Sequence, residues 1–375
     1  YQDALPVLFA SLEQTIGQDM AYATQWQGLT PGDREQAADL LRVISRCFAQ
    51  LGGVDAVDLY FTQHGQRAYK NQIVLALADW YVEQEQVSEA ASTWLALAQA
   101  NPLSAQAPRL TSRAISLYQK AGFQRRRIEL QARFVLTYGM ASDFWKFQSP
   151  EDFPDTVAQL QSSLQELSRF AHVQAVETGD ANQVREAEQW YRDYLAWFSD
   201  KPDAAEMNFQ LAELLYDHGH YQLAWDEYER TAWSRGSHAR TTAAALGAQH
   251  ASAKVLQLAD TAQQPALTKR ATAGALRFVA SYPAHRAAPG LLVRSGTVLL
   301  EQQQYDRALN SSEQVIAATS ASTDLRQVAW SLRAQALFAI ADYAGAAAAY
   351  REALQLASKD DERRPALQAG LASAT

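Results

Sequence analysis

The side chains most often used in catalysis and metal binding are scattered through this chain. The seven histidines are His64, His172, His218, His220, His238, His250 and His285. None belongs to a His-Glu-x-x-His motif, in which one helix face presents two imidazoles to zinc. His218 and His220 flank Gly219, and this spacing predicts a surface turn rather than a metal site.

The single cysteine and the acidic residues give no catalytic arrangement either. Cys47 lies in the apolar stretch 43–48, which predicts core packing, and a lone cysteine excludes an intramolecular disulfide and a cysteine zinc cluster. Asp360, Asp361 and Glu362 precede Pro365 and predict a solvated loop rather than a general acid–base pair. The sequence has no glycine-rich phosphate loop and no Gly-x-Ser-x-Gly elbow. We therefore expect no enzyme activity, no catalytic or metal-binding residue and no cofactor.

Composition indicates which elements position the side chains. Among 375 residues, 48% are hydrophobic, which is enough for a large core and excludes a mostly disordered chain. Only 17 glycines and 11 prolines occur, which favours long helices over a many-turned β fold. No stretch has the length and apolar composition of a membrane span. The net charge of −8 argues against nucleic acid, and the basic run 125–127 predicts a solvated helix face.

A spaced pattern recurs along the chain. Its reference position holds a small residue, namely Ala78, Ala114, Ala212, Gly296 and Ala334. Three residues later come Tyr81, Leu117, Leu215, Leu299 and Leu337. Nine residues later come Val87, Phe123, Tyr221, Tyr305 and Tyr343. Twelve residues later come Ala90, Arg126, Ala224, Ala308 and Ala346. Sixteen residues later come Trp94, Leu130, Tyr228, Ser312 and Tyr350, and of all these only Arg126 and Ser312 break the pattern.

The spacing predicts a pair of closely packed helices. Small residues at the reference position and twelve residues later allow the two backbones to approach, because a large side chain would separate them. The aromatic residue at nine closes the turn between the helices. The residue at sixteen packs against the next unit of the repeat.

This pattern resembles the tetratricopeptide repeat (TPR), a helix-turn-helix unit of about 34 residues. The clearest copies are 71–102, 205–233 and 324–358. The resemblance implies an all-α fold, a right-handed superhelical solenoid of about eight helical hairpins. The segment 139–154 breaks the repeat and predicts an irregular insertion. It would separate an N-terminal block, 1–138, from a C-terminal block, 155–375.

The resemblance also implies which residues face a partner. In TPR units, the concave surface takes the positions six and three before the reference residue and one, four and five after it. The partner-binding candidates are Gln72, Asp79, Glu83, Tyr118, Gln119, Phe209, Glu213, Tyr216, Asp217, Gln335 and Phe338. They combine acids, glutamines and aromatics, which would suit an extended segment with basic and apolar side chains. None of these positions carries the Lys, Asn or Arg with which chaperone-binding TPR proteins clamp a carboxylate.

Tryptophan offers an alternative binding surface. Trp190 and Trp197 are seven residues apart, with Tyr191 and Tyr194 between them, and predict a broad aromatic helix face. Packing between hairpins is the first interpretation of this face. A platform for a partner or for a glycan is the second, because aromatic residues are enriched where proteins bind.

Three short segments bear on where in the cell the protein is located. The segments 281–289, 134–146 and 228–233 are similar to unit starts and other strings in TPR proteins of the bacterial periplasm, outer membrane and gliding machinery. We expect a scaffold that binds protein partners in an envelope assembly for secretion, motility or polysaccharide export. It would be periplasmic and associated with the outer membrane, with no membrane span of its own and any lipid anchor outside this segment.

Two other functions stay open from the sequence. One is a cytoplasmic peptide-binding regulatory TPR module, and the other is a helical domain of a larger protein that binds glycan or peptidoglycan. The chain begins at Tyr1, and 365–367 resembles the start of another helix shortly before Thr375. We therefore expect a segment of a longer protein.

Overall fold

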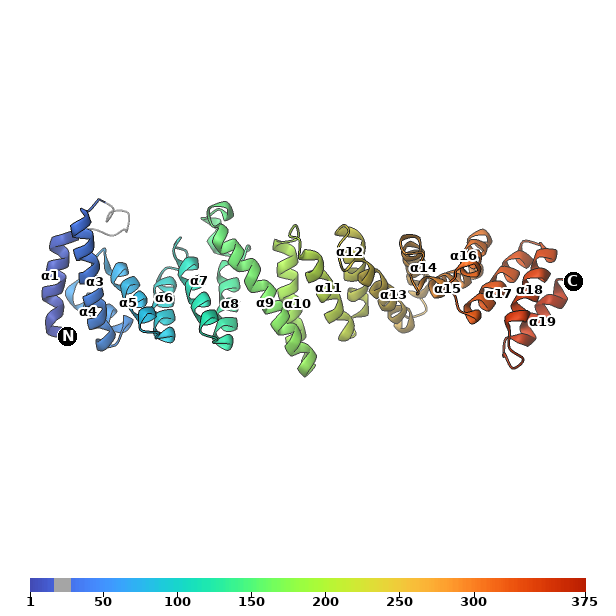
Figure 1. Cartoon of the computed structure of the whole chain (residues 1–375), viewed down its shortest axis with the longest axis horizontal. Coiled ribbons are helices and arrows are strands. Elements are labelled where there is room, and N and C mark those ends of the chain that lie inside the picture. Colours follow the sequence, from blue (N-terminus) through green and yellow to red (C-terminus); the bar gives the residue numbers. More distant parts are fainter. Residues whose placement is uncertain (17–27) are drawn as a thin grey trace. The chain divides into compact units, whose positions relative to one another are not determined.

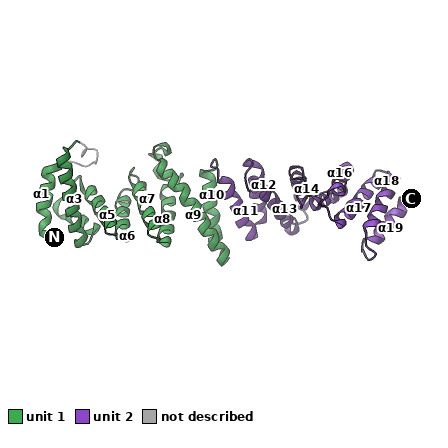
Figure 2. Cartoon of the chain, viewed as in Figure 1, with its two compact units in different colours: residues 1–199 green, residues 200–375 purple. Residues whose placement is uncertain are grey.

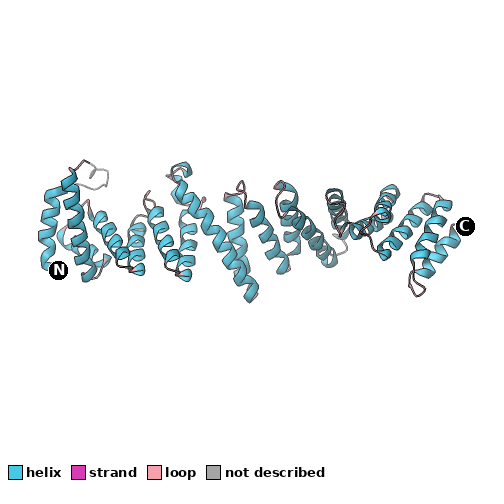
Figure 3. Cartoon of the chain, viewed as in Figure 1, coloured by secondary structure: helices cyan, strands magenta, loops and turns pink. Residues whose placement is uncertain are grey.

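The structure is a computed structural model that describes residues 1–16 and 28–375. Throughout these two ranges the chain consists of helices joined by turns, and no strand occurs in them (Figures 1 and 3). Within each of the two compact units described below, consecutive helices pack against each other, so the expected all-α solenoid of helical hairpins is confirmed. Among the same residues, no helix combines the length and apolar composition that crossing a bilayer requires.

The chain forms two compact units, residues 1–199 and residues 200–375 (Figure 2). The boundary between them follows the helix pair that contains Trp190 and Trp197. The division into blocks at 139–154, which the sequence predicts, stays a prediction about the organisation of the chain.

Unit 1 begins with a short 3-10 helix and continues through helices that pack in sequence. Its helices are α1 (Leu5–Ile16), α3 (Pro31–Leu51), α4 (Val54–His64), α5 (Lys70–Glu83), α6 (Val87–Ala100), α7 (Ala107–Lys120), α8 (Gln124–Tyr138), α9 (Pro154–Thr178) and α10 (Ala181–Trp197). The pairs α5–α6, α6–α7 and α9–α10 are in close contact, and α3 packs on both α1 and α5. Cys47 is buried in the core that α1, α3, α4 and α5 share, as the apolar stretch around it predicts.

Unit 2 repeats the hairpin without a long interruption. Its helices are α11 (Ala204–Asp217), α12 (Tyr221–Ser234), α13 (Thr241–Leu258), α14 (Gln264–Ser281), α15 (Ala288–Glu301), α16 (Tyr305–Ala317), α17 (Thr323–Ala339), α18 (Tyr343–Leu356) and α19 (Arg364–Ser373). Every consecutive pair is in contact, and α15 also packs on α17, the first helix of the following hairpin.

Five hairpin turns share one backbone geometry. The residue with positive φ in these turns is Glu85, Gly122, Gly219, Gln303 or Ala341. The N–H of the residue after it donates to a carbonyl five residues earlier. These bonds run from Gln86 to Tyr81, Phe123 to Tyr118, His220 to Leu215, Gln304 to Leu299 and Asp342 to Leu337, at 2.8–3.0 Å. The turns therefore give an alignment of the hairpins that does not depend on side-chain type.

This alignment corrects the register of α7 by one residue. The bond from Phe123 to Tyr118 makes Tyr118 the equivalent of Tyr81, so the reference position of α7 is Ile115 rather than Ala114. The sequence pattern selected Ala114 because it required a small residue. In the corrected register, the surface positions of α7 are Arg109, Ser112, Ser116, Gln119 and Lys120.

Aromatic residues at position sixteen pack against the next hairpin, as the pattern predicts. A Cβ on Gly247 of α13 would lie 2.6 Å from the ring of Tyr228, and a Cβ on Gly370 of α19 would lie 2.5 Å from the ring of Tyr350. Trp94 of α6 makes the related contact with Arg113 of α7, whose guanidinium lies 4.2 Å from the ring centre. A glycine or a long flexible side chain thus receives each ring.

The segment between α8 and α9 is ordered by aromatic contacts. It contains two short 3-10 helices, η2 (Asp143–Lys146) and η3 (Pro150–Asp152). Phe144 is buried and packs edge-on against Tyr138, Trp145 and Phe153, with ring centres 4.9–5.4 Å apart. The indole N–H of Trp145 donates to the Tyr138 carbonyl at 2.7 Å. These contacts hold Phe153 at the start of α9.

Candidate functional site

The exposed face of α7 lines the groove of unit 1, an open groove of about 570 Å³. Arg109, Ser112, Ser116 and Lys120 all border it, and these are surface positions of the corrected α7 register. Val82 of α5, Trp94 of α6 and Leu117 of α7 add apolar lining. The groove therefore lies where first helices of neighbouring hairpins present their surface positions.

The opposite wall of the groove comes from η3 and the first turn of α9. Asp152, Phe153, Pro154, Asp155 and Thr156 line it. The aromatic cluster around Phe144 fixes Phe153 in this wall, so the ordered segment before α9 has an identifiable role. It closes one side of a surface that would otherwise be open.

The two walls carry opposite unpaired charges. Arg109 and Lys120 of α7 are exposed, and neither makes an ion pair within the described residues. Asp152 and Asp155 on the facing wall are likewise exposed and make no ion pair in that part of the chain. The groove is thus polarised across its width, because its basic side and its acidic side lie on different elements.

Arg113 differs from the other cations of α7 because its charge is already compensated. Its Nη2 lies 2.7 Å from the Asp79 carboxylate of α5, and its guanidinium stacks on Trp94. This stack covers the apolar base of the groove with a cation.

The sequence-predicted residues of α5 are not among those that line this groove, to which α5 contributes Val82. Asp79 and Glu83 are exposed, and Gln72 is half-buried. The negative charge of Asp79 is compensated by Arg113, which pairs with it. Binding of a partner by these three residues and by the exposed Gln119 stays a prediction.

Two candidate residues are buried, contrary to the expectation that they face a partner. Tyr118 is 7% exposed because, in the corrected register, it occupies the packing position that Tyr81 has in α5. Phe209 is 8% exposed because the ring of Tyr228 lies 5.9 Å away and the guanidinium of Arg240 covers it at 5.1 Å. Neither ring is available to a partner in this structure.

Two further candidates of unit 2, Glu213 and Tyr216, make contacts within their own hairpin. Glu213 accepts a hydrogen bond from the Tyr228 hydroxyl, and burial together with this carboxylate raises the pKa of Tyr228 above its ordinary range. Tyr216 packs edge-on against Tyr221 at 5.2 Å, while Asp217 is exposed.

The aromatic residue at position nine packs against the last turn of the first helix. Phe338 and Tyr343 repeat the Tyr216–Tyr221 contact, also at 5.2 Å. Position nine therefore covers the hairpin turn from outside, with Tyr343 half exposed, rather than filling its interior. Phe338 and Gln335 remain exposed on the surface of α17.

Acidic residues on first helices find their partners one repeat further along. Asp79 pairs with Arg113 and Glu206 pairs with Arg240, and in both pairs the residues are 34 apart in sequence. These arginines were missed by the sequence pattern, which scored single units. Opposite charges separated by one repeat length were the available signal.

Two charged segments that the sequence predicts to be solvated, 125–127 and 360–362, each contribute a residue to contacts with another helix. Arg127 pairs with Glu166 of α9 and is largely buried. Asp361 accepts hydrogen bonds from Arg363 and from Gln327 of α17, and Arg363 holds the pKa of Asp361 well below its usual range. The connection before α19 is therefore tied to α17 and is not a free loop.

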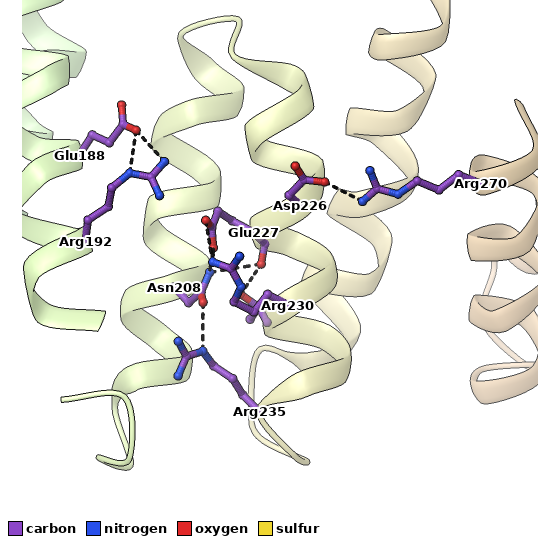
Figure 4. A network of polar contacts seen from close by, with 9 residues as sticks. Glu188, Arg192, Asn208, Asp226, Glu227, Arg230, Arg235 and Arg270 are labelled. Atoms are coloured by element: carbon purple, nitrogen blue, oxygen red, sulfur yellow. Dashed lines mark hydrogen bonds and ion pairs between the residues drawn. The ribbon is translucent and has the colours of Figure 1, made fainter. Parts of the chain in front are cut away.

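A buried polar network joins α11 to α12 (Figure 4). The Glu227 carboxylate, 4% exposed, accepts hydrogen bonds from Asn208 Nδ2 at 2.8 Å and from Arg230 Nη1 at 2.7 Å. Arg235 Nε donates to Asn208 Oδ1 at 3.0 Å. Burial lowers the pKa of Arg235, and the neighbouring Arg230 adds to this effect. Since each group finds a partner, the network acts as a structural clamp.

Arginine side chains also connect α14 to α12. Arg270 of α14 lies 2.7 Å from the Asp226 carboxylate, a contact drawn in Figure 4, and it also pairs with Glu229. Its guanidinium stacks on the Trp225 ring at 4.0 Å. In unit 1, Glu188 and Arg192 form a pair within α10, also shown in Figure 4. These contacts stabilise the helices and compensate the charges of Arg270 and Arg192 within the chain.

The aromatic face of α10 packs inside unit 1. Trp190, Tyr191 and Tyr194 are buried, and the ring of Trp197 occupies the place of a side chain on Gly139, where a Cβ would lie 2.6 Å away. Packing, the first interpretation from sequence, is therefore the one observed. The second interpretation, a platform for a glycan, would need an exposed aromatic face, which α10 does not present.

The histidines of the α11–α12 turn lie at the end of α11, His218, and at the start of α12, His220. His218 Nδ1 lies 2.8 Å from the Leu214 carbonyl, a contact within its own helix end. Among the described residues, no group of three or more His, Cys, Asp or Glu side chains is placed to hold a metal ion.

Comparison with known proteins gives similarity in structure only. No protein-family model and no curated protein matches the sequence. A tetratricopeptide repeat protein from Thermus thermophilus is 20% identical, with a TM-score of 0.28 over 56% of this chain and 98% of its own. A tetratricopeptide repeat protein from Parabacteroides merdae is 12% identical, with a TM-score of 0.27 over 81% of this chain and 98% of its own. The C-terminal part of a TPR repeat-containing protein from Cytophaga hutchinsonii is 14% identical, with a TM-score of 0.35 over 78% of this chain and 98% of its own.

Proposed function

We propose that this tetratricopeptide repeat protein is a non-enzymatic scaffold whose unit 1 groove holds an extended segment of a partner protein. The observation that carries the proposal is the groove itself. It is open, lies on the surface positions of α7, and is bordered by Arg109, Lys120, Asp152 and Asp155, none of which has an ion pair within the described residues.

The size and lining of the groove support a peptide rather than a compact small molecule. Its volume of about 570 Å³ is within the usual range for ligand sites, yet its walls come from several elements, α5, α6, α7, η3 and α9, and remain open. An extended segment can lie along such a surface with its side chains reaching both walls. The apolar contacts come from Val82, Leu117 and Phe153.

Site-specific crosslinking in cells tests this function. The photoreactive residue p-benzoyl-phenylalanine at Ser116, which is exposed in the groove, is expected to capture a partner protein. The matched control places the same residue at Gln355, which is exposed on α18 of unit 2. Identical products from both positions, or no product from Ser116, would contradict the proposal.

We further propose that the scaffold works in a bacterial envelope assembly and lies in the periplasm beside the outer membrane. The support is the similarity of 281–289, 134–146 and 228–233 to segments of envelope TPR proteins. Fractionation of cells expressing the native gene is the test. Recovery with periplasmic or outer-membrane markers supports the location, while recovery with cytoplasmic markers supports the regulatory-module alternative.

A further inference from the structure

We propose that the unit 1 groove selects an extended segment in which acidic and basic side chains alternate. This inference rests on the proposed function and specifies the chemistry of the partner. It follows from the placement of opposite unpaired charges on the two walls of one groove.

The basic wall is a stripe along α7. Arg109 and Lys120 are separated by about 16 Å along the helix, at 1.5 Å per residue. Arg113 lies between them but is paired with Asp79, so the ends of the stripe carry the available positive charge. About five residues of an extended chain cover the same length.

The acidic wall faces this stripe from η3 and α9. Asp152 and Asp155 both border the groove and have no ion-pair partner among the residues described. A segment with only acidic side chains would be attracted to α7 and repelled by this wall. A segment with only basic side chains would meet the reverse arrangement.

An extended chain resolves this conflict through its own geometry. Successive side chains of an extended strand point to opposite sides, and residues on one side repeat about every 6.7 Å. Alternating Glu and Lys therefore place carboxylates toward Arg109 and Lys120 and ammonium groups toward Asp152 and Asp155. The stems of these side chains can pack on Val82, Leu117 and Phe153.

Two synthetic peptides of identical composition provide the test. One contains Glu-Lys-Glu-Lys-Glu-Lys, the other Glu-Glu-Glu-Lys-Lys-Lys, and both have the same Gly-Ser flanks and fluorescein label. Fluorescence anisotropy with the whole chain at low salt is expected to show binding of the alternating peptide at least about fivefold tighter than the block peptide. Equal affinities would overturn the inference.

Charge-reversal variants assign the binding to the groove. The double variant Arg109→Glu, Lys120→Glu is expected to lose the preference for the alternating peptide. The control Arg125→Glu, Lys359→Glu changes the net charge equally at exposed positions outside the groove and is expected to keep it. Circular dichroism confirms that both variants fold, and retention of the preference in the first variant would contradict the inference.

A variant of the other wall gives an independent reading. The double variant Asp152→Lys, Asp155→Lys makes both walls basic. A hexaglutamate peptide is therefore expected to bind this variant more tightly than the alternating peptide does. An unchanged order of the peptides would also overturn the inference.

The outcome is separable from that of the proposed function. If Ser116 captures a partner whose contacting segment has no alternating charge, the scaffold function stands and this selectivity fails. If the alternating peptide binds while Ser116 captures no protein in cells, the selectivity of the groove stands and the scaffold function fails.

Discussion

The ring of Tyr228 occupies the space that a side chain on Gly247 would need. A Cβ added to Gly247 would lie 2.6–2.8 Å from three ring atoms, and the hydroxyl of Tyr228 is held by Glu213 on the other side. The ring therefore cannot swing away freely. This contact joins two successive hairpins of unit 2, because Tyr228 belongs to α12 and Gly247 to α13.

Replacing Gly247 by alanine should destabilise unit 2. Overpacking of this kind costs about 1–3 kcal/mol, which exceeds the gain of at most about 1 kcal/mol in helix propensity. The matched control is Gly290→Ala in α15, where a Cβ would meet no atom within 4 Å. The control is expected to be neutral or more stable, and urea unfolding followed by circular dichroism compares the two. A Gly247→Ala variant as stable as Gly290→Ala would show that the Tyr228 ring can move to accommodate a Cβ at position 247.

Asn208→Ala should be costly although it removes only a small side chain. Asn208 Nδ2 donates to the buried Glu227 carboxylate, and a hydrogen bond to a charged group contributes about 1.5–3 kcal/mol. Its loss also frees Arg235 Nε from its bond to Asn208 Oδ1. Gln210→Ala on the same helix removes a bond to the less buried Glu206 and is the control. Similar unfolding midpoints for the two variants would argue against the clamp.

The contact of Asp361 with Arg363 predicts a pH-dependent contribution to stability. The folded pKa of Asp361 lies below its unfolded value of about 3.9, so the unfolded chain takes up this proton more readily. The stabilisation is fully present above that value and is lost as the pH falls toward the folded pKa. Asp361→Asn should therefore lower the thermal midpoint at pH 7, with a difference from the parent that narrows below about pH 4.

The neighbouring Asp360 provides the control for this pH effect. It is exposed and makes no ion pair within the described residues, so Asp360→Asn should change the midpoint little at either pH. A constant difference in thermal midpoint between the Asp361→Asn variant and its parent across the acidic range would show that stability is not linked to the protonation of Asp361.

The two ion pairs spaced by one repeat should contribute equally and weakly. Asp79–Arg113 and Glu206–Arg240 are both partly exposed, and exposed pairs typically contribute about 0.2–1 kcal/mol. Double-mutant cycles with alanine at each pair should give coupling energies in this range. The couplings should disappear near about 1 M salt, where the screening length falls to about 3 Å. A coupling energy that stays unchanged at this salt concentration would contradict the description of these contacts as screened surface pairs.

Much of the hairpin architecture could be predicted from residue spacing. The small reference residues, the aromatic at sixteen and the helical turns follow from how closely two helices can approach, and Tyr228 and Tyr350 pack where the spacing placed them. The burial of Cys47 also follows from its apolar neighbours. Such features depend on contacts between residues close in sequence.

The groove could not be predicted, because two of its features are not set by the side-chain spacing that defines the pattern. The register of α7 is fixed by the turn bond from Phe123 to Tyr118, whereas the spacing pattern followed the small Ala114. That difference of one residue hid Arg109 and Lys120. The acidic wall depends on the irregular segment before α9, where Phe153 is placed by ring contacts that no helical period encodes.

The one-repeat spacing of Asp79–Arg113 and Glu206–Arg240 has an evolutionary consequence. Each acid meets an arginine carried by the unit that follows, so the pairing depends on which two units are neighbours. Recombination that excises the second unit removes the arginine from the pair, and an insertion of a few residues between the two units moves it out of reach. These contacts therefore constrain the order of the units as well as their number.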